Sequence, residues 1–316
     1  MSFTSDVKEE LSRIELSDNT KRAQLSALLQ ILASINISSD GMKLTITTTN
    51  GAVIRRIATD LNYLYQIKCK ITYQKQINLD KKTIYSVVVS EKVEDILFDL
   101  DLWTDKGLQD HPRMMFLNND EMIRSYLAGC FMSSGSISSP TSTSYHMEIV
   151  ANSEEHGQFL IKLLDKFYIK AKMTTRRNDD VVYLKSAEMI ADFLNVIGAG
   201  DALLEFEDIR IQRDFVNSIQ RLENVKIANE KKILAVADEQ YETVSFLLEH
   251  DLLKQLSEKD QEIAMLRYEN PDASLMELSD LLYIQSKTTL SKSGIRHRFE
   301  KITALAEKYK ERQNNE

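Results

Sequence analysis

The residues best suited to binding an anion gather near the end of the chain. Residues 284–312 contain eight lysines and arginines and three glutamates, a net charge of +5. Residues 1–283 carry −12, and Glu316 brings the chain to its total of −8. A basic segment on an acidic body indicates a nucleic-acid partner, while the acidic total excludes a protein coated in positive charge. The alternative is that these charges only form the solvated face of a helix, and on charge alone this alternative is preferred.

The residue types in and before this segment match the groups of DNA. Arg and Lys side chains suit the O6 and N7 acceptors of guanine, and Ser and Thr hydroxyls suit phosphates. His297 by itself is more often a surface or capping residue than a base reader. The candidate DNA-binding residues are Ser274, Lys287, Thr289, Ser291, Lys292, Ser293, Arg296, His297, Arg298 and Lys301.

Three short helices are predicted to position these side chains. Residues 258–268 follow the N-cap Ser257, and Pro271 ends that helix. Residues 274–277 (Ser-Leu-Met-Glu) form a capping box that opens a second helix, predicted over residues 275–282. Ser291 caps a third helix running to about residue 309. We interpret this as a helix-turn-helix, whose last helix enters the major groove; its predicted inward stripe is Ile295, Phe299, Ile302 and Ala306.

Composition limits the rest of the chain. A length of 316 residues suggests two or three domains, and 43% apolar residues supply packed cores. Cys69 and Cys130 are the only cysteines, which excludes a disulfide scaffold and a cysteine zinc site, so we expect no metal and no cofactor. No long apolar run predicts a membrane helix, and the acidic N-terminus is unlike a signal peptide. We therefore expect a cytoplasmic protein.

A repeat is visible at an offset of 102 residues. Residues 65–72 (Tyr-Gln-Ile-Lys-Cys-Lys-Ile-Thr) align with residues 167–174 (Phe-Tyr-Ile-Lys-Ala-Lys-Met-Thr). In the first copy we predict helices at 21–35, 52–66 and 91–100, with strands at 43–49, 68–75 and 83–90. The second copy gives helices at 122–133, 154–168 and 187–197, with strands at 145–151, 170–177 and 181–186. Each copy is thus αβαββα, and we expect an α+β pseudo-dimer of repeats at about 20–100 and 122–198.

The first helix of the second repeat carries a motif. Residues 125–137, Ser-Tyr-Leu-Ala-Gly-Cys-Phe-Met-Ser-Ser-Gly-Ser-Ile, resemble the LAGLIDADG motif of homing endonucleases. Gly129 and its repeat partner Ala27 are small, so the two helices can approach closely. The alternative is an ordinary buried helix containing small residues.

That resemblance also bears on catalysis. In homing endonucleases the acid before the closing glycine binds the divalent metal, and both repeats supply one. Here those positions are Ser134 and Leu32. Asp40, a few residues further on, is interpreted as a turn residue before Gly41. We therefore expect no catalytic residue, and a scaffold that has lost its active site.

The repeated strands could still contact DNA. Side chains alternate along a strand, so Lys68, Lys70, Thr72 and Gln74 share one face. In the nuclease family the corresponding polar sheet face forms a saddle over DNA. A residual DNA saddle is therefore hypothesised, against the alternative of an ordinary solvated face. Its candidate residues are Lys68, Lys70, Lys170, Lys172 and Arg176.

Taken over nearly its full length, the chain resembles the WhiA family, sporulation regulators and cell-division proteins of Gram-positive bacteria. The most specific stretch is residues 290–298, Leu-Ser-Lys-Ser-Gly-Ile-Arg-His-Arg, which resembles the family's Leu-Ser-Lys-Ser-Gly-Val-Asn-His-Arg. Arg296 replaces the usual Asn, and an arginine reads guanine where asparagine favours adenine. Ser133-Ser134 replaces the family's usual Gly or Ala, and residues 224–229 also depart from the family pattern.

The resemblance implies a degenerate LAGLIDADG domain and a C-terminal helix-turn-helix. We place these at 1–217 and 257–316, with a helical connector at 218–256. It implies a non-catalytic protein that binds double-stranded DNA at the nucleoid, acting in cell division and chromosome segregation or in transcription regulation. Two alternatives stay open: a protein-interaction hub, for example for a sigma factor, and a residual metal-dependent nuclease. No membrane partner is expected, and the sequence leaves the oligomeric state open.

Overall fold

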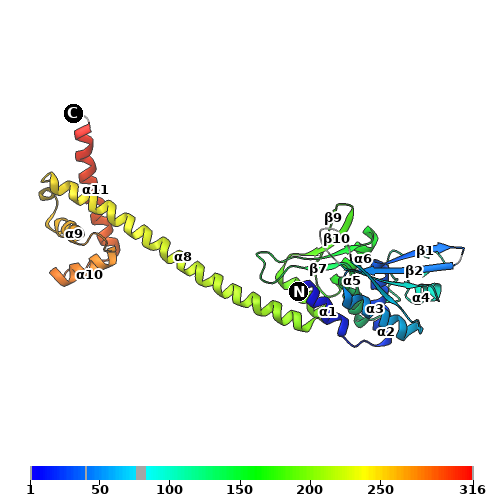
Figure 1. The fold of residues 1–316 in the computed structure, drawn as a ribbon. Helices are drawn as coiled ribbons and strands as arrows, with labels where there is room; N and C mark the ends of the chain where they lie inside the picture. Colours follow the sequence, from blue (N-terminus) through cyan, green and yellow to red (C-terminus); the bar gives the residue numbers. More distant parts are fainter. Residues whose placement is uncertain (1, 40, 76–82, 315–316) are drawn as a thin grey trace. The chain divides into compact units, whose positions relative to one another are not determined.

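A computed structural model describes residues 2–39, 41–75 and 83–314, so Asp40 lies outside the described residues. The chain divides into two compact units, residues 1–213 and residues 214–316 (Figure 1). The boundary falls inside one helix, α8 (Gly200–Glu249). The first unit mixes helices and sheets and the second is helical, which confirms the predicted fold class.

The first unit contains two copies of one arrangement. The first copy consists of α2 (Asp18–Leu32), β1 (Ala33–Ser38), β2 (Gly41–Thr48), α3 (Gly51–Tyr65), β3 (Ile71–Lys75), β4 (Thr83–Val89) and α4 (Val93–Asp99). The second consists of α5 (Asp120–Ser134), β7 (Gly135–Ile137), β8 (Met147–Ala151), α6 (Glu154–Asp165), β9 (Lys172–Arg176), β10 (Asp179–Leu184) and α7 (Ala187–Ile197). The strand orders, β1-β2-β4-β3 and β7-β8-β10-β9, match, with antiparallel neighbours throughout. The internal repeat is therefore confirmed.

Each copy has one strand more than the predicted αβαββα pattern. The first helix was expected to reach Ile35, but α2 ends at Leu32 and residues 33–38 form β1. The reason is the alternating Ser-Ile-Asn-Ile-Ser segment, which pairs with β2 and places Ile35 opposite Leu44. In the second copy, residues 135–137 pair with β8 in the same way.

The two repeats share one core. Helices α2 and α5 lie against each other, and buried residues from both repeats form a single hydrophobic cluster. Helix α1 (Phe3–Arg13) adds Phe3, Val7 and Leu11 to it. The apolar stripes of both repeats are thus buried against each other, as a pseudo-dimer requires.

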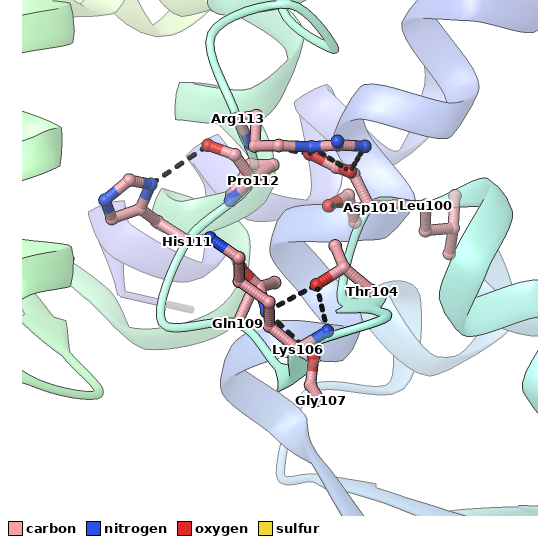
Figure 2. Close-up of polar contacts among 10 residues, drawn as sticks. Leu100, Asp101, Thr104, Lys106, Gly107, Gln109, His111, Pro112 and Arg113 are labelled. Carbon is pink, nitrogen blue, oxygen red and sulfur yellow. Dashed lines mark hydrogen bonds and ion pairs between the residues drawn. The ribbon is translucent and has the colours of Figure 1, made fainter.

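The segment joining the repeats is fastened by side-chain hydrogen bonds (Figure 2). It contains the short strands β5 (Trp103–Thr104) and β6 (Gly107–Leu108). The buried carboxylate of Asp101 accepts hydrogen bonds from the backbone N–H of Arg113 at 2.6 Å and from its Nε at 2.8 Å. Gln109 Nε2 donates to Thr104 Oγ1 at 2.9 Å and to the Gly107 carbonyl at 2.8 Å. These bonds hold the linker in one conformation between the repeats.

The second unit is a helical bundle. It contains the end of α8, a short 3-10 helix η1 (Leu253–Gln255), α9 (Glu258–Glu269), α10 (Leu275–Ser286) and α11 (Lys292–Asn314). Its core includes Val244 and Leu247 of α8 together with Leu253, so the last part of the predicted connector packs with the helix-turn-helix. Helices α10 and α11 both run further than predicted, past Leu282 and Tyr309.

Candidate nucleic-acid interface

Helix α11 is positioned by local bonds at its start. The Ser291 hydroxyl accepts the backbone N–H of Gly294 at 3.2 Å, which is an N-cap. Lys287 ends α10 in the left-handed conformation at φ 56° and allows the chain to turn. Ser279 Oγ then donates to the Leu290 carbonyl, joining α10 to the turn. The helix-turn-helix geometry is therefore fixed by the turn itself as well as by the core.

The two faces of α11 differ as the sequence predicts. Ile295, Phe299, Ile302 and Ala306 are buried, which confirms the inward stripe. The opposite face exposes Ser291, Lys292, Ser293, Arg296, His297 and Lys301. The structure thus brings six of the ten candidate side chains onto the first three turns of one helix or its cap.

Glu300 modifies the charge of this face. Its carboxylate lies 3.1 Å from His297 Nδ1 and 3.7 Å from Arg296 Nε, and all three side chains are exposed. Exposed pairs of this kind contribute little stability, about 0–1 kcal/mol. Arg296 and His297 can therefore leave Glu300 for another acceptor at small cost.

The remaining candidates are placed differently. Arg298 is largely buried, and its Nη1 donates to Asp260 of α9 at 2.8 Å. The Ser274 hydroxyl and backbone N–H are both used in the capping box with Glu277, which confirms that predicted cap. Lys287 lies over the Tyr283 ring at 5.4 Å, and Thr289 is exposed in the turn.

Arg267 is a structural residue that the sequence did not single out. It is only 1% exposed, and its Nη1 donates to the carbonyls of Asn270 and Pro271 at 3.2 and 3.1 Å. Its Nη2 donates to Gln240 Oε1 of α8 at 3.0 Å. Burial lowers the pKa of Arg267. This guanidinium shapes the turn that starts α10, and a lone arginine in a helix gives no sequence signal of such a role.

The candidate saddle residues lie on or beside the edge strands of the two sheets. Lys172 and Arg176 are exposed on β9, with Met173 half-buried on the opposite face. Lys170 precedes β9, and Lys68 and Lys70 precede β3; all three are exposed. On the second sheet, Lys172 is opposite Tyr183, which is in turn opposite the acidic Glu148. That face therefore carries charges of both signs.

Ser134 and Leu32, the two positions where the sequence predicts no metal ligand, make structural contacts. Ser134 Oγ donates to the Val150 carbonyl at 2.7 Å, joining the end of α5 to β8. Leu32 is half-buried against the core. Over residues 2–39, 41–75 and 83–314, no group of three His, Cys, Asp or Glu side chains is arranged to hold a metal ion. A membrane-crossing helix is likewise missing from this described part of the chain.

Known protein families match most of the chain. Residues 18–103 match the WhiA N-terminal LAGLIDADG-like domain, residues 123–216 the WhiA LAGLIDADG-like domain, and residues 219–306 the WhiA C-terminal HTH domain. The third match begins well before the predicted 257, within α8.

Relatives and solved structures agree with these matches. The probable cell division protein WhiA of Latilactobacillus sakei is 38% identical over 98% of this chain and 99% of its own length. The probable cell division protein WhiA of Staphylococcus carnosus is 39% identical over 98% of this chain and 97% of its own length. The crystal structure of full-length DUF199/WhiA from Thermatoga maritima covers 98% of this chain and 99% of its own, with 24% identity and a TM-score of 0.60, and shows the same fold. By its three domain matches and these relatives, the chain belongs to the WhiA family.

Proposed function

We propose that this protein binds double-stranded DNA without cutting it, through the exposed N-terminal turns of α11, and that it acts in cell division. The observation that carries the proposal is the exposure of Lys292, Ser293, Arg296 and His297 on one side of a helix whose other side is buried. A helix presented in this way by a preceding helix and turn is the reading element of a helix-turn-helix.

The chemistry of this surface suits a DNA groove. The N-terminus of α11 offers unpaired backbone N–H groups and the positive end of the helix dipole, which favour a phosphate near Ser291 and Ser293. Lys292 and Arg296 lie one turn apart along the helix, so both can face the same groove. Arg296 is the residue expected to select guanine.

The cell-division role rests on the relatives, which are named probable cell division proteins. Chromosome segregation, transcription regulation and a nucleoid location are further proposals. Each requires DNA binding first, because the helix-turn-helix is the part of the chain whose surface fits DNA. A map of the genomic sites bound in cells would separate a regulator bound at promoters from a segregation factor bound elsewhere.

The primary test is DNA affinity at several salt concentrations. Fluorescence anisotropy with a labelled duplex should show a logarithmic affinity that falls steeply and linearly with the logarithm of salt concentration. Changing both Lys292 and Arg296 to Ala should weaken binding and reduce that slope by about 2. The matched control is Lys308→Ala with Arg312→Ala, which removes the same charge from the far end of α11. Equal affinity in the test and control variants would contradict the proposal.

A protein-interaction role is the second candidate, favoured by one surface. A groove of about 630 Å³ beside α10 is bordered by Glu269, Asp272, Glu277 and Asp280. A protein whose only partner lies there would keep that interaction when Lys292 and Arg296 are changed, and would show little DNA affinity. The residual-nuclease alternative predicts Mg²⁺-dependent nicking of plasmid DNA; the non-catalytic proposal predicts none.

A further inference from the structure

An open groove lies between helix α3 and the edge of the first sheet. It has a volume of about 800 Å³ and is lined by one side of α3 and by residues at and just before the start of β3. The apolar part of its lining is half-buried and consists of Ala58, Cys69 and Ile71. The groove belongs to the first unit, so it is separate from the helix-turn-helix and from the acidic groove beside α10.

The residues of α3 that line the groove differ from their counterparts in the second repeat. At the offset of 102 residues, Arg55, Ala58 and Asn62 correspond to Gly157, Leu160 and Leu164 of α6. The three residues of α6 are buried, whereas Arg55 and Asn62 are exposed. Met173 of β9 packs so closely against Gly157 that a β-carbon there would overlap the methionine sulfur. The second repeat thus fills with its own side chains the space that is open in the first.

A different packing of α3 explains the open groove. Arg56 and Asp60 are buried, and Arg56 Nη1 donates to the Ile14 carbonyl at the end of α1, at 2.7 Å. Their counterparts on α6, Gln158 and Lys162, are exposed. The buried side of α3 is therefore turned towards α1, and the side that α6 packs against its own sheet is left uncovered on α3. The groove is a fixed feature of the folded unit.

One wall of the groove is the edge of a sheet. In the order β1-β2-β4-β3, strand β3 stands at the end and pairs with β4 through residues 71–75. Alternate backbone N–H and C=O groups along such an edge face outwards and can pair with another strand. Just before β3, the main-chain groups of Lys68, Cys69 and Lys70 make no hydrogen bond to any residue that the structure describes. An extended peptide lying in the groove can therefore bond to main-chain groups along this wall.

The charge of the groove is positive. Arg55 and Lys68 line it, and none of the described lining residues is acidic. Lys21 lies 4.5 Å from the ring centre of Tyr63 at one end, where Asp18 faces the Tyr63 hydroxyl, so positive charge stays in excess. On a chain with a net charge of −8, a basic groove selects an acidic partner.

We propose that this groove binds an extended, acidic peptide segment of another protein, which adds to β3 as a fifth strand of the first sheet. The main chain of the peptide bonds to the sheet edge, and its apolar side chains rest on the apolar lining. Its carboxylates pair with Arg55 and Lys68. The surface is separate from the DNA-binding face of α11, so the protein could hold a partner through one unit and DNA through the other.

Selection of short random peptides displayed on phage, with the full chain as bait, tests this proposal. The selected peptides should be enriched in Asp and Glu and in the β-branched residues that favour strands. One selected peptide, labelled with fluorescein, then gives a dissociation constant by fluorescence anisotropy. Selection of peptides without acidic residues would overturn the proposal.

Two variants test the groove with that peptide. Ala58→Leu with Asn62→Leu introduces the residues of the equivalent α6 positions and fills the groove. Arg55→Glu reverses its charge, and each variant should weaken peptide binding by about tenfold or more. The matched controls are Gln158→Leu and Lys162→Glu, at exposed positions of α6. Thermal unfolding of every variant should stay close to that of the parent, because these positions lie outside the core. Unchanged affinity in both groove variants, or an equal loss in the controls, would overturn the proposal.

Hydrogen–deuterium exchange locates the bound peptide. An added strand should protect the backbone amides of residues 68–75 from exchange, because it bonds to that edge. The amides of β9, the equivalent edge strand of the second repeat, are the internal control and should exchange as before. Absence of protection at β3 would overturn the proposal. Protection of β3 by a DNA duplex and by no peptide would also overturn it, and would assign the groove to nucleic acid.

Discussion

Gly129 lies against Ala27 where α5 crosses α2. A β-carbon added to Gly129 would lie 2.8 Å from the Ala27 Cβ and 2.5 Å from the Gln24 carbonyl oxygen. The second contact is to backbone, which cannot rotate away. The close approach of the two repeat helices therefore depends on a glycine at this position, as the motif at residues 127–129 predicts.

Replacing Gly129 with Ala should destabilise the first unit. Alanine raises helix propensity by about 1 kcal/mol, but the steric overlap costs about 1–3 kcal/mol or more, so we expect a net loss. The single tryptophan, Trp103, lies in this unit and reports its unfolding in urea. Gly200→Ala, where an added Cβ meets no atom within 4 Å, is the control and should be neutral or slightly stabilising. If the Gly129→Ala protein is as stable as the parent, α2 and α5 can move apart to accept the methyl group without a cost in stability.

The sequence predicts those features of the fold that recur in both repeats or that depend on neighbouring residues. The offset of 102 residues predicted both repeats, and the Ser274 capping box and inward stripe of α11 were predicted from adjacent residues. The strands β1 and β7 were missed, because short segments directly after an apolar helix continue its pattern until pairing with β2 or β8 is known. Long-range contacts left no local signal: Arg267 reaches Gln240 across two helices, and Arg298 reaches Asp260.

Arg298 and Arg296 should therefore differ when each is changed to Ala. Loss of Arg298 leaves the largely buried Asp260 carboxylate without its cation, so we expect the second unit to lose about 2 kcal/mol of stability. Loss of the exposed Arg296 should change stability by less than about 0.5 kcal/mol, but should weaken DNA binding. Circular dichroism in urea measures the stability and anisotropy measures the affinity. Equal stability of the two variants would show that the bond to Asp260 contributes little.

The same ion pair gives the second unit a pH dependence. Burial raises the pKa of Asp260, but hydrogen bonds from Ser257 and Arg298 and the charge of Arg298 outweigh it, so the net pKa is lowered. A lowered carboxyl pKa adds stability above the unfolded value of about 3.9, and that stability is lost as the pH falls through the folded pKa. Asp260→Asn should remove this contribution to the loss of stability at low pH. If the free energy of unfolding falls equally with pH below 5 in the parent and in the variant, Asp260 is not the source of this pH dependence.

His156 should make the first unit sensitive to mild acid. Its Nε2 lies 3.1 Å from Tyr126 Oη, which donates to Gln30 Oε1 at 2.8 Å, so Tyr126 links the imidazole to the first repeat. Burial, then the nearby His111, lowers the pKa of His156 to about 4. The unfolded imidazole takes up a proton below about pH 6.5 and the folded one does not, so stability falls as the pH drops from 6.5 towards 4.

Between pH 7 and pH 5 this difference corresponds to a loss of roughly 2 kcal/mol. A His156→Gln protein should be less stable at pH 7 but should lack that part of the pH dependence. Urea unfolding followed by Trp103 fluorescence at the two pH values measures both effects. An unchanged pH dependence in the variant would assign the acid sensitivity to other groups.

The candidate saddle can be tested in the full chain by reversing charge on β9. Lys172→Glu with Arg176→Glu should weaken DNA binding and lower the salt slope if that sheet face contacts phosphate. Lys162→Glu with Lys166→Glu, at exposed positions on and just after α6, makes the same change of net charge and is the control. Glu148 gives the opposite test: Glu148→Gln removes an acid from the proposed saddle face and should raise affinity. If the β9 and α6 variants bind DNA with the same affinity, the effect comes from net charge alone. The β9 face then makes no specific contact with DNA, and the hypothesis of a saddle is wrong.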